Sequence, residues 1–282
     1  MSNIFRDRVA VVTGAGSGIG RALSLGLAQR GAKLAISDIE EGPVEATANM
    51  ARDNGADVIA DRLDVTDRAA FSAYSERVVA AFGRVNQLFN NAGIASRNDP
   101  FVEMPAEQFD RVISVNLDGV VNGTRVFLPH LIASGEGHLV TISSLNGFMA
   151  QPHMSPYVTS KFAVRGLTEA IRQEMLYDGH PVEVTVVHPG GVATNIASRK
   201  ASEIDQLPAD KQAAARRRLK VYQEKLLTMP PEKAAAEILD GMERGRRRII
   251  LTSKAKRLDY LVRLMPSGYI PIVTKKLREV FG

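Results

Sequence analysis

The chain has 282 residues, 45% of them hydrophobic and 24% charged, which is the composition of an ordinary globular protein with a sizeable core. It has no cysteine, which excludes disulfides, thiolate catalysis and cysteine zinc sites. Its five histidines lack metal-ligand spacing, so we expect no metal. No stretch approaches the roughly 18 apolar residues of a membrane span, and the N-terminus is charged where a signal peptide is apolar. These features predict a cytoplasmic protein.

Short apolar runs alternate with helical patterns along the first two thirds of the chain. Residues 8–14 predict a strand and 20–31 a helix closed by Gly31. The alternation continues with strands expected at 33–38, 57–65, 85–93, 137–144 and 182–190, and helices at 43–54, 67–83, 106–133 and 155–177. Nearly continuous apolar strands separated by helices predict an α/β fold, a single doubly wound domain whose parallel sheet is covered on both faces.

The pattern loosens in the last third of the chain. Residues 195–229 are polar and helical, which suits an insertion that forms a lid over the substrate site. A helix over 230–245 and a strand over 246–253 then complete a domain expected at 1–253. The extension 254–282 mixes apolar and basic residues, which suits packing on the domain, a subunit contact or a membrane-surface helix pair.

Charge is distributed unevenly along the chain. Residues 199–282 carry 20 Lys and Arg against 10 Asp and Glu, whereas residues 1–198 have a net negative charge. The basic part either binds an acidic partner, such as an anionic lipid surface or a phosphate-bearing substrate, or is the solvated face of exposed helices. We expect no nucleic-acid partner.

The stretch "TGAGSGIG" (13–20) forms a glycine-rich turn between the first strand and the first helix. A strict G-x-G-x-x-G pattern starting at Gly14 would place its third glycine at position 19, which is Ile19. Glycines still allow close backbone approach to a phosphate at a helix N-terminus, and no Lys-Ser/Thr pair of a nucleotide-hydrolysing loop follows. The stretch therefore predicts a dinucleotide site with a variant spacing.

Asp38 ends the second strand about 20 residues after the loop, where a carboxylate accepts hydrogen bonds from the ribose hydroxyls of NAD. The same carboxylate would repel a 2′-phosphate. Neither the loop residues Ala15 and Ser17 nor Ile39 offers a compensating cation. We therefore predict NAD rather than NADP as the cofactor.

Tyr157 and Lys161 lie four residues apart near the start of a predicted helix, with Ser155 as the expected N-cap and Pro156 at the first helical position. A tyrosine titrates near 10 and is a poor base at neutral pH unless a neighbouring ammonium lowers its pKa. The pair is therefore a candidate acid/base site, although the spacing alone also fits an ordinary surface pair.

Five further patterns stand in order around this pair: glycines at 14, 18 and 20, "NNAG" (90–93), Asn116 in "VNLDG", Ser144 in "ISS" and "HPGGVAT" (188–194). In this set the chain resembles the short-chain dehydrogenase/reductase family, closely over residues 6–195 and loosely to 253. The resemblance implies a Rossmann fold and an NAD-dependent oxidoreductase acting on a secondary alcohol or its ketone or aldehyde. It also implies a homodimer or homotetramer.

The resemblance implies a role for each matching residue. The catalytic set would be Tyr157 as proton donor and acceptor, Lys161 lowering its pKa and holding the nicotinamide ribose, Ser144 binding the substrate oxygen, and Asn116 anchoring a proton-relay water. The implied cofactor-binding residues are Gly14, Ser17, Gly18, Ile19, Gly20, Asp38, Asp64, Val65, Asn91, Ala92, Gly93, Tyr157, Lys161, Pro189, Gly190, Val192 and Thr194. The chain departs from the family at Asn86, where an acid is common, and in its longer C-terminal end.

The expected substrate pocket is mostly apolar. We predict substrate contacts from Ser144, Asn146, Phe148, Met149, Met154 and Tyr157, with Ile94, Leu145, His153 and Ile196 nearby. This lining favours an uncharged, hydrophobic alcohol or ketone, although Phe and Met here also suit plain packing. Two other functions are considered: a non-catalytic dinucleotide-sensing scaffold on the same fold, and a peripheral membrane dehydrogenase of the lipid, steroid or retinoid type.

Overall fold

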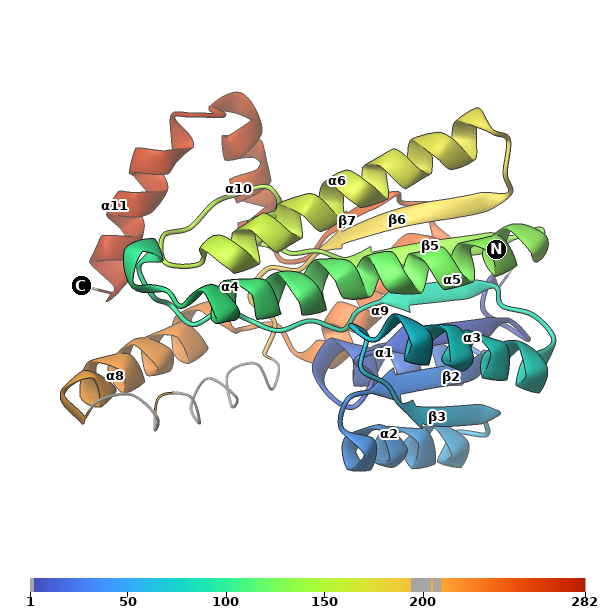
Figure 1. Cartoon of the computed structure of the whole chain (residues 1–282). Helices are drawn as coiled ribbons and strands as arrows, with labels where there is room; N and C mark the ends of the chain where they lie inside the picture. Colours follow the sequence, from blue (N-terminus) through green and yellow to red (C-terminus); the bar gives the residue numbers. More distant parts are fainter. Residues whose placement is uncertain (1–2, 194–203, 205–208, 282) are drawn as a thin grey trace.

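A computed structural model describes residues 3–193, 204 and 209–281. The strands found in this part of the chain form one parallel sheet in the order β3-β2-β1-β4-β5-β6-β7 (Figure 1). Their bounds are β1 Val9–Thr13, β2 Lys33–Asp38, β3 Val58–Arg62, β4 Gln87–Asn90, β5 Gly137–Ile142, β6 Val182–His188 and β7 Arg248–Ile250. The predicted doubly wound α/β fold is confirmed.

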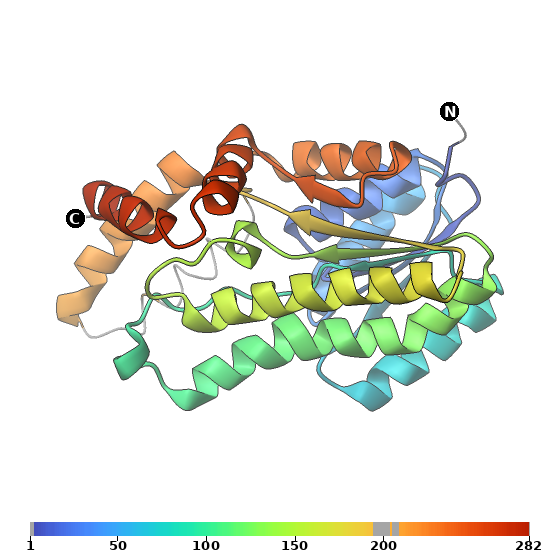
Figure 2. The same ribbon diagram turned by 90° about the horizontal axis from the view of Figure 1, so that it is seen from above.

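Two helical layers cover the sheet (Figure 2). The strands alternate their side chains between them: Ala10 and Val12 of β1 join one core cluster, and Val9 and Val11 join the other. One layer contains α1 Gly18–Gln29, α2 Glu41–Asp53 and α9 Pro231–Glu243; the other contains α3 Arg68–Phe82, α5 Gly119–Ala133 and α6 Ser155–Tyr177. Burial on both faces explains why the strands are almost entirely apolar.

The strand order reverses between β1 and β4, which run side by side with Val11 paired to Leu88. In doubly wound sheets, ligands bind outside the carboxyl ends of the strands at this reversal. The glycine-rich turn follows β1, and the "NNAG" stretch follows β4. The topology therefore brings two separate sequence motifs to one crevice.

The expected helix over 106–133 is divided into three parts. α4 (Ala106–Ile113) and α5 flank a π-helical turn over Ser114–Asp118. Asn116 lies in this turn. Single π-turns within α-helices often occur at functional sites.

The start of α6 differs from its predicted cap. The N-cap is Met154, and Ser155 is the first helical residue, with a buried hydroxyl that has no hydrogen-bond partner among the described residues. The prediction of Ser155 as N-cap is therefore wrong by one residue, because Ser155 is already helical and its hydroxyl accepts no hydrogen bond from a helix amide. Pro156 remains in the first turn.

Asn86 stands where an acid is common in the family that the chain resembles. Its Oδ1 accepts a hydrogen bond from the Val9 amide at 3.1 Å and so joins the start of β1 to the chain before β4. Its Nδ2 is buried and has no hydrogen-bond partner among the described residues. The contact with Val9 needs only an oxygen acceptor, which an amide and a carboxylate both supply.

Two helices after β7 form an extension at the carboxyl end of the sheet (Figures 1 and 2). α10 (Ser253–Leu264) and α11 (Tyr269–Phe281) are joined by a short turn, and α11 contacts α8 (Ala209–Leu226). Within the described ranges no helix combines the length and apolarity needed to cross a bilayer.

Candidate active site

The glycine-rich turn is shaped by close backbone contacts. Gly14 has a positive φ of 65°, and a Cβ on Gly20 would lie 2.1 Å from the Gly14 carbonyl oxygen. No larger residue fits at position 20 without moving the backbone. The Ser17 side chain does not cap α1, so the first amides of the helix stay available to an anion. These features fit a pyrophosphate.

Asp38 is held at the carboxyl end of β2 by two backbone amides. Its Oδ2 accepts from the Gly16 amide at 2.9 Å and its Oδ1 from the Glu40 amide at 3.1 Å. A carboxylate fixed in this way retains lone pairs for ribose hydroxyls. Arg21 lies close by, with hydrogen bonds to the Gly16 carbonyl and, at 3.0 Å, to Thr47 Oγ1. This cation was not predicted, because Arg21 lies just outside the glycine stretch.

The segment after β4 clamps the glycine turn. Asn91 Nδ2 donates to the carbonyl oxygens of Thr13 and Gly14 at 2.9 and 3.1 Å, and the Ala92 amide donates to Thr13 Oγ1 at 3.1 Å. A Cβ on Gly93 would lie 3.4 Å from Lys161 Nζ. The predicted residues Asn91, Ala92 and Gly93 thus join the phosphate turn to the centre of the crevice.

Asp64 and Val65 follow β3, beside the other predicted adenosine contacts. Asp64 Oδ1 accepts from the amide and hydroxyl of Thr66 at 2.9 and 2.8 Å. The Val65 carbonyl accepts from Asn122 Nδ2 at 3.0 Å, and its side chain is nearly buried. Both residues lie on the turn between β3 and α3, in hydrogen-bonded positions.

Ser144, Tyr157 and Lys161 meet between the ends of β5 and α6. Burial raises the pKa of Tyr157, and a hydrogen bond with the Ser144 side chain partly offsets this. Lys161 Nζ lies 5.7 Å from the centre of the Tyr157 ring and donates to the Ile142 carbonyl at 3.1 Å. Burial lowers the pKa of Lys161 from 10.5 to about 8. The expected lowering of the tyrosine pKa by the ammonium does not outweigh burial here.

Asn116 is fully buried beside this group. Its Oδ1 accepts from the Ile94 amide at 2.8 Å, and its Nδ2 donates to the Ile94 carbonyl at 3.0 Å and to Ser160 Oγ at 3.1 Å. The amide therefore ties the chain after β4 to α6. The water-anchoring role of Asn116 stays a prediction.

The predicted substrate residues lie against the C-terminal helices. Phe148 and Met149 are almost completely buried in a cluster with Tyr269 and Val273 of α11. The Ala150 amide also donates to the Tyr269 hydroxyl oxygen at 3.1 Å. Packing is thus the role that the structure shows for Phe148 and Met149, and it places the extension against residues that were predicted to contact the substrate.

The other predicted substrate residues lie on the turns around Ser144. The Asn146 amide donates to Ser144 Oγ at 3.1 Å, and Asn146 Nδ2 lies 4.0 Å from Met154 Sδ. His153 is exposed and has a positive φ of 63°. Asn146 and Met154 are therefore connected to Ser144, whereas His153 is a loop residue at the surface.

The loop after β6 closes the other side of the site. The Pro189 carbonyl accepts from the Leu145 amide at 2.8 Å, a Cβ on Gly190 would lie 2.5 Å from Thr252 Oγ1, and Val192 bridges to Met229. The predicted residues Thr194 and Ile196 lie outside the described residues.

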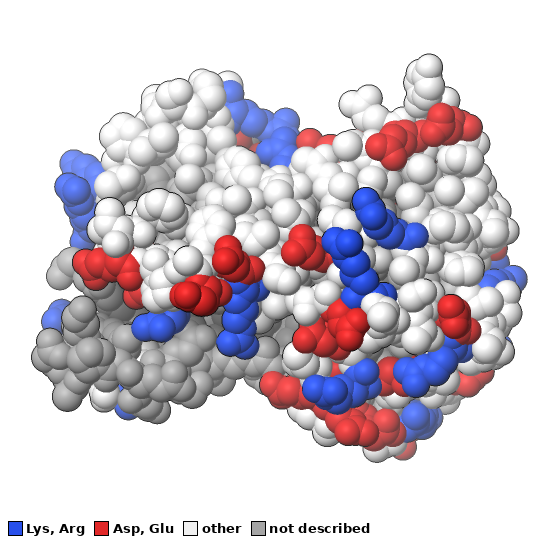
Figure 3. All heavy atoms as spheres, viewed as in Figure 1, with Lys and Arg blue, Asp and Glu red and all other residues white. Residues whose placement is uncertain are grey.

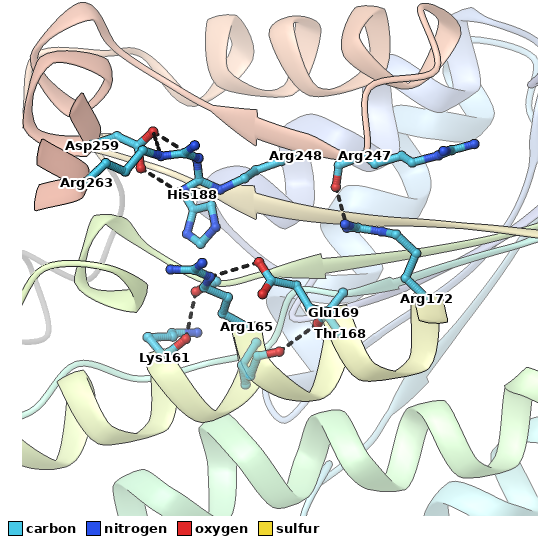
Figure 4. A network of polar contacts seen from close by, with 12 residues as sticks. Lys161, Arg165, Thr168, Glu169, Arg172, His188, Arg247, Arg248, Asp259 and Arg263 are labelled. Atoms are coloured by element: carbon cyan, nitrogen blue, oxygen red, sulfur yellow. Dashed lines mark hydrogen bonds and ion pairs between the residues drawn. The ribbon is translucent and has the colours of Figure 1, made fainter. Parts of the chain in front are cut away.

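A line of contacts that includes His188, Arg248 and Asp259 reaches α10 (Figure 4). His188 Nδ1 lies 2.8 Å from the Ser144 carbonyl, which only accepts, so Nδ1 carries the proton. Burial lowers the pKa of His188 to about 4 and keeps it neutral. The Phe148 ring packs edge-on against His188 with ring centres 5.2 Å apart, and the Arg248 guanidinium lies 5.4 Å from the Phe148 ring centre.

The Arg248–Asp259 ion pair ends this line. Arg248 donates through both terminal nitrogens to Asp259 at 2.9 and 2.7 Å, and Arg263 Nε lies 3.0 Å from the same carboxylate. Burial raises the pKa of Asp259, but its bonds with Arg248 and Arg263 prevail and hold it below the usual 3.8. The ion pair therefore fastens α10 to β7 and to the wall of the site.

We expect Asp259→Asn to lower the free energy of unfolding by about 2 kcal/mol near neutral pH, because a buried bidentate pair loses its charge. A carboxyl group with a lowered pKa stabilises the fold above 3.8 and loses this effect as pH falls through its folded pKa. The difference from wild type should therefore shrink in acid. Urea unfolding measures it, with Asp240→Asn as control, since the Arg30–Asp240 pair is far more exposed and worth about 0–1 kcal/mol. If both variants lose the same free energy of unfolding, the Arg248–Asp259 pair does not stabilise the fold more than an exposed ion pair does.

His188, Arg248, Asp259 and Tyr269 were not predicted as site residues. His188 could have been noticed at the end of an apolar strand, directly before the "PGG" turn. The contacts of Arg248 with Phe148 and of Ala150 with Tyr269 join positions 100 and 119 residues apart, and the Arg248–Asp259 pair joins a strand to the following helix 11 residues later. No spacing rule predicts them. In the described part of the chain, no group of three or more potential ligands could hold a metal.

Taken together, the glycine turn, the fixed Asp38 and the Ser144–Tyr157–Lys161 group define an oxidoreductase of the Rossmann fold. A family model described as short chain dehydrogenase matches residues 8–205. The chain is 47% identical over 277 residues, 98% of either protein, to the oxidoreductase SadH of Mycobacterium tuberculosis. It is 33% identical over 233 residues, 82% of this chain and 86% of the relative, to levodione reductase of Leifsonia aquatica.

Solved structures agree with these relatives. A short-chain dehydrogenase/reductase from Burkholderia phymatum in complex with NAD superposes with a TM-score of 0.86, covering 95% of this chain and 97% of that one at 31% identity. The chain belongs to the short-chain dehydrogenase/reductase family, and it is an oxidoreductase.

Proposed function

We propose that this protein interconverts an uncharged, hydrophobic secondary alcohol and its ketone with NAD as the cofactor. The observation that carries the proposal is the meeting of Ser144, Tyr157 and Lys161 at the crevice that also holds the glycine turn. Tyrosine, hydroxyl and ammonium together supply a proton, an oxygen contact and a positive charge. A scaffold that only senses dinucleotides would need none of the three.

Each residue of the candidate site has its own role in the proposed reaction. NAD, when bound, accepts or returns a hydride. Tyr157 exchanges the proton with the substrate oxygen, and Ser144 donates a hydrogen bond to that oxygen as its charge develops. Lys161, buried and directed to this end of the sheet, holds the nicotinamide ribose and favours the tyrosinate. Asn116 anchors the water that carries the proton onward.

The cofactor residues fit a dinucleotide along the crevice. The amides at the start of α1 suit the pyrophosphate, Asp38 the adenosine ribose, Asp64 and Val65 the adenine, and the Pro189–Val192 loop the carboxamide. Thr194 would complete that loop. NAD is also the molecule bound to the Burkholderia relative.

We expect kcat/KM to be at least about a hundredfold higher with NAD than with NADP, because Asp38 would face a 2′-phosphate at close range. Replacing Asp38 by Ser should lower this ratio, mainly because NAD binding becomes weaker. Arg21 would then be the nearby charged side chain, and it is a cation. Steady-state kinetics with both cofactors measures the ratio. Equal or better efficiency of the unchanged protein with NADP would overturn the assignment.

The remaining parts of the chain have proposed supporting roles. Residues 1–253 act as the catalytic domain, with the 195–229 segment as a lid, and 254–282 as an extension beside the substrate. The packing of Phe148 against α11 supports an apolar site. Exposed apolar side chains on α6, such as Phe162 and Leu176, favour a homodimer or homotetramer, which we place in the cytoplasm.

A further inference from the structure

The turn between α10 and α11 exposes a group of apolar side chains. This hairpin tip, residues 264–272, contains Leu264 with 81% of its surface exposed and Ile270 with 53%, and Met265 and Ile272 are also exposed. Isolated exposed apolar residues are normal on a protein surface, whereas a contiguous group marks a contact with another molecule.

Cationic side chains flank the hairpin tip on both helices. Arg257 and Arg263 on α10 are exposed, as are Lys275, Lys276 and Arg278 on α11. Asp259 is the one acidic residue between positions 257 and 278, and it is buried in its pair with Arg248. The accessible charge around the tip is therefore positive. Figure 3 shows Lys and Arg at the edges of a broad uncharged surface where α10 and α11 lie.

The fold holds the hairpin in a fixed position. On its inner side Tyr269 and Val273 pack against Phe148 and Met149, and the Arg248–Asp259 pair fastens α10. Its outer side extends beyond the body of the sheet (Figures 1 and 2). The apolar tip thus belongs to an anchored element and points away from the core.

We propose that the hairpin tip docks the protein on an anionic lipid surface. The apolar side chains of residues 264–272 enter the boundary between headgroups and acyl chains, and the flanking cations bind the lipid phosphates. Docking in this way brings the wall of the substrate site to the bilayer, where apolar alcohols and ketones concentrate. The proposal goes beyond the proposed function, since lipid binding requires no turnover.

A second copy of the chain fits this surface less well. A twofold interface presents the same patch from both subunits, so Lys275 and Lys276 of one copy would face those of the other. Of the nearby carboxylates, Asp259 is already paired with Arg248 and Arg263, and the exposed Glu279 offers one negative charge against several cations. An anionic surface neutralises these cations, whereas self-association brings like charges together.

The test is co-sedimentation of the full-length protein with vesicles of phosphatidylcholine alone and with vesicles containing about one-third phosphatidylglycerol. We expect binding to the anionic vesicles at low salt and its loss at high salt, because surface charge is screened. Two double variants, Leu264→Asp with Ile270→Asp and Lys275→Glu with Lys276→Glu, should each weaken binding by at least about tenfold.

Matched controls separate the hairpin tip from overall charge. Phe101→Asp with Val102→Asp changes two exposed apolar residues between β4 and α4, and Arg244→Glu with Arg246→Glu reverses two exposed cations before β7. Both controls should bind as wild type does. Absence of binding at low salt, or equal loss in the controls, would overturn the proposal. So would a concentration-dependent dimer that Leu264→Asp with Ile270→Asp abolishes while vesicle binding persists.

Discussion

Replacing Tyr157 by Phe should lower kcat by about 10²- to 10⁴-fold while leaving NAD binding within about threefold of wild type. Phe keeps the ring that packs beside Lys161 and removes only the hydroxyl that exchanges the proton. Because this proton moves in the transition state, kcat and kcat/KM should fall together. Steady-state kinetics gives the first result, and quenching of protein tyrosine fluorescence by NAD gives the second.

A matched substitution distinguishes chemistry from packing. Tyr269→Phe also removes a tyrosine hydroxyl near the candidate site. This hydroxyl accepts a hydrogen bond from the Ala150 amide and takes no part in the proposed proton transfer. The substitution should reduce kcat by less than about tenfold. If Tyr157→Phe retains near-wild-type turnover, or if both variants lose activity equally, Tyr157 is not the proton donor.

Lys161→Met should produce a more stable protein that is nearly inactive. Burial lowers the pKa of Lys161 from 10.5 to about 8, so the folded state carries a cost of about 3 kcal/mol for its ammonium at neutral pH. Met removes this cost. It also leaves the Ile142 carbonyl without its hydrogen-bond donor, which destabilises the fold by about 1–3 kcal/mol. We expect a net gain of about 1 kcal/mol and a fall in kcat of at least about a hundredfold.

The pH dependence gives the sign of this effect. Below the folded pKa of about 8 the lysine is charged in both states and the full cost is present; above 10.5 it is neutral in both and the cost is gone. Wild-type stability should therefore rise relative to Lys161→Met between about pH 8 and pH 10. Urea unfolding at about pH 7 and about pH 9.5 checks this. A variant less stable than wild type at both values would show that the ammonium stabilises the fold.

The sequence was sufficient to predict the architecture and to choose the residues that the structure brings together in the candidate site. Apolar strands that alternate with helices predict a parallel sheet covered by helices on both faces. In such a sheet every strand ends at the same edge. The glycine turn and Asn91 each follow a strand and Asp38 ends one, so their meeting at one edge of the sheet follows from the topology. Tyr157 and Lys161 are four residues apart on a helix, which places them on one face.

Features that depend on tertiary contacts could not be predicted in this way. The π-helical turn at Ser114–Asp118 has the same hydrophobic pattern as an α-helix. The contacts from His188 through Phe148 to Arg248 join the end of β6, the segment after β5 and the start of β7. The raised pKa of Tyr157 depends on burial, which neighbouring charges in the sequence do not reveal.

The most direct test of the central claim mixes the protein and NAD with a panel of uncharged secondary alcohols, and the protein and NADH with the matching ketones, while NADH absorbance is followed. Hydride transfer assisted by Ser144, Tyr157 and Lys161 predicts turnover with at least one hydrophobic pair, in both directions, and none with the carboxylated analogues. Tight NAD binding without any change in NADH across the whole panel would contradict this account and favour a dinucleotide-sensing scaffold.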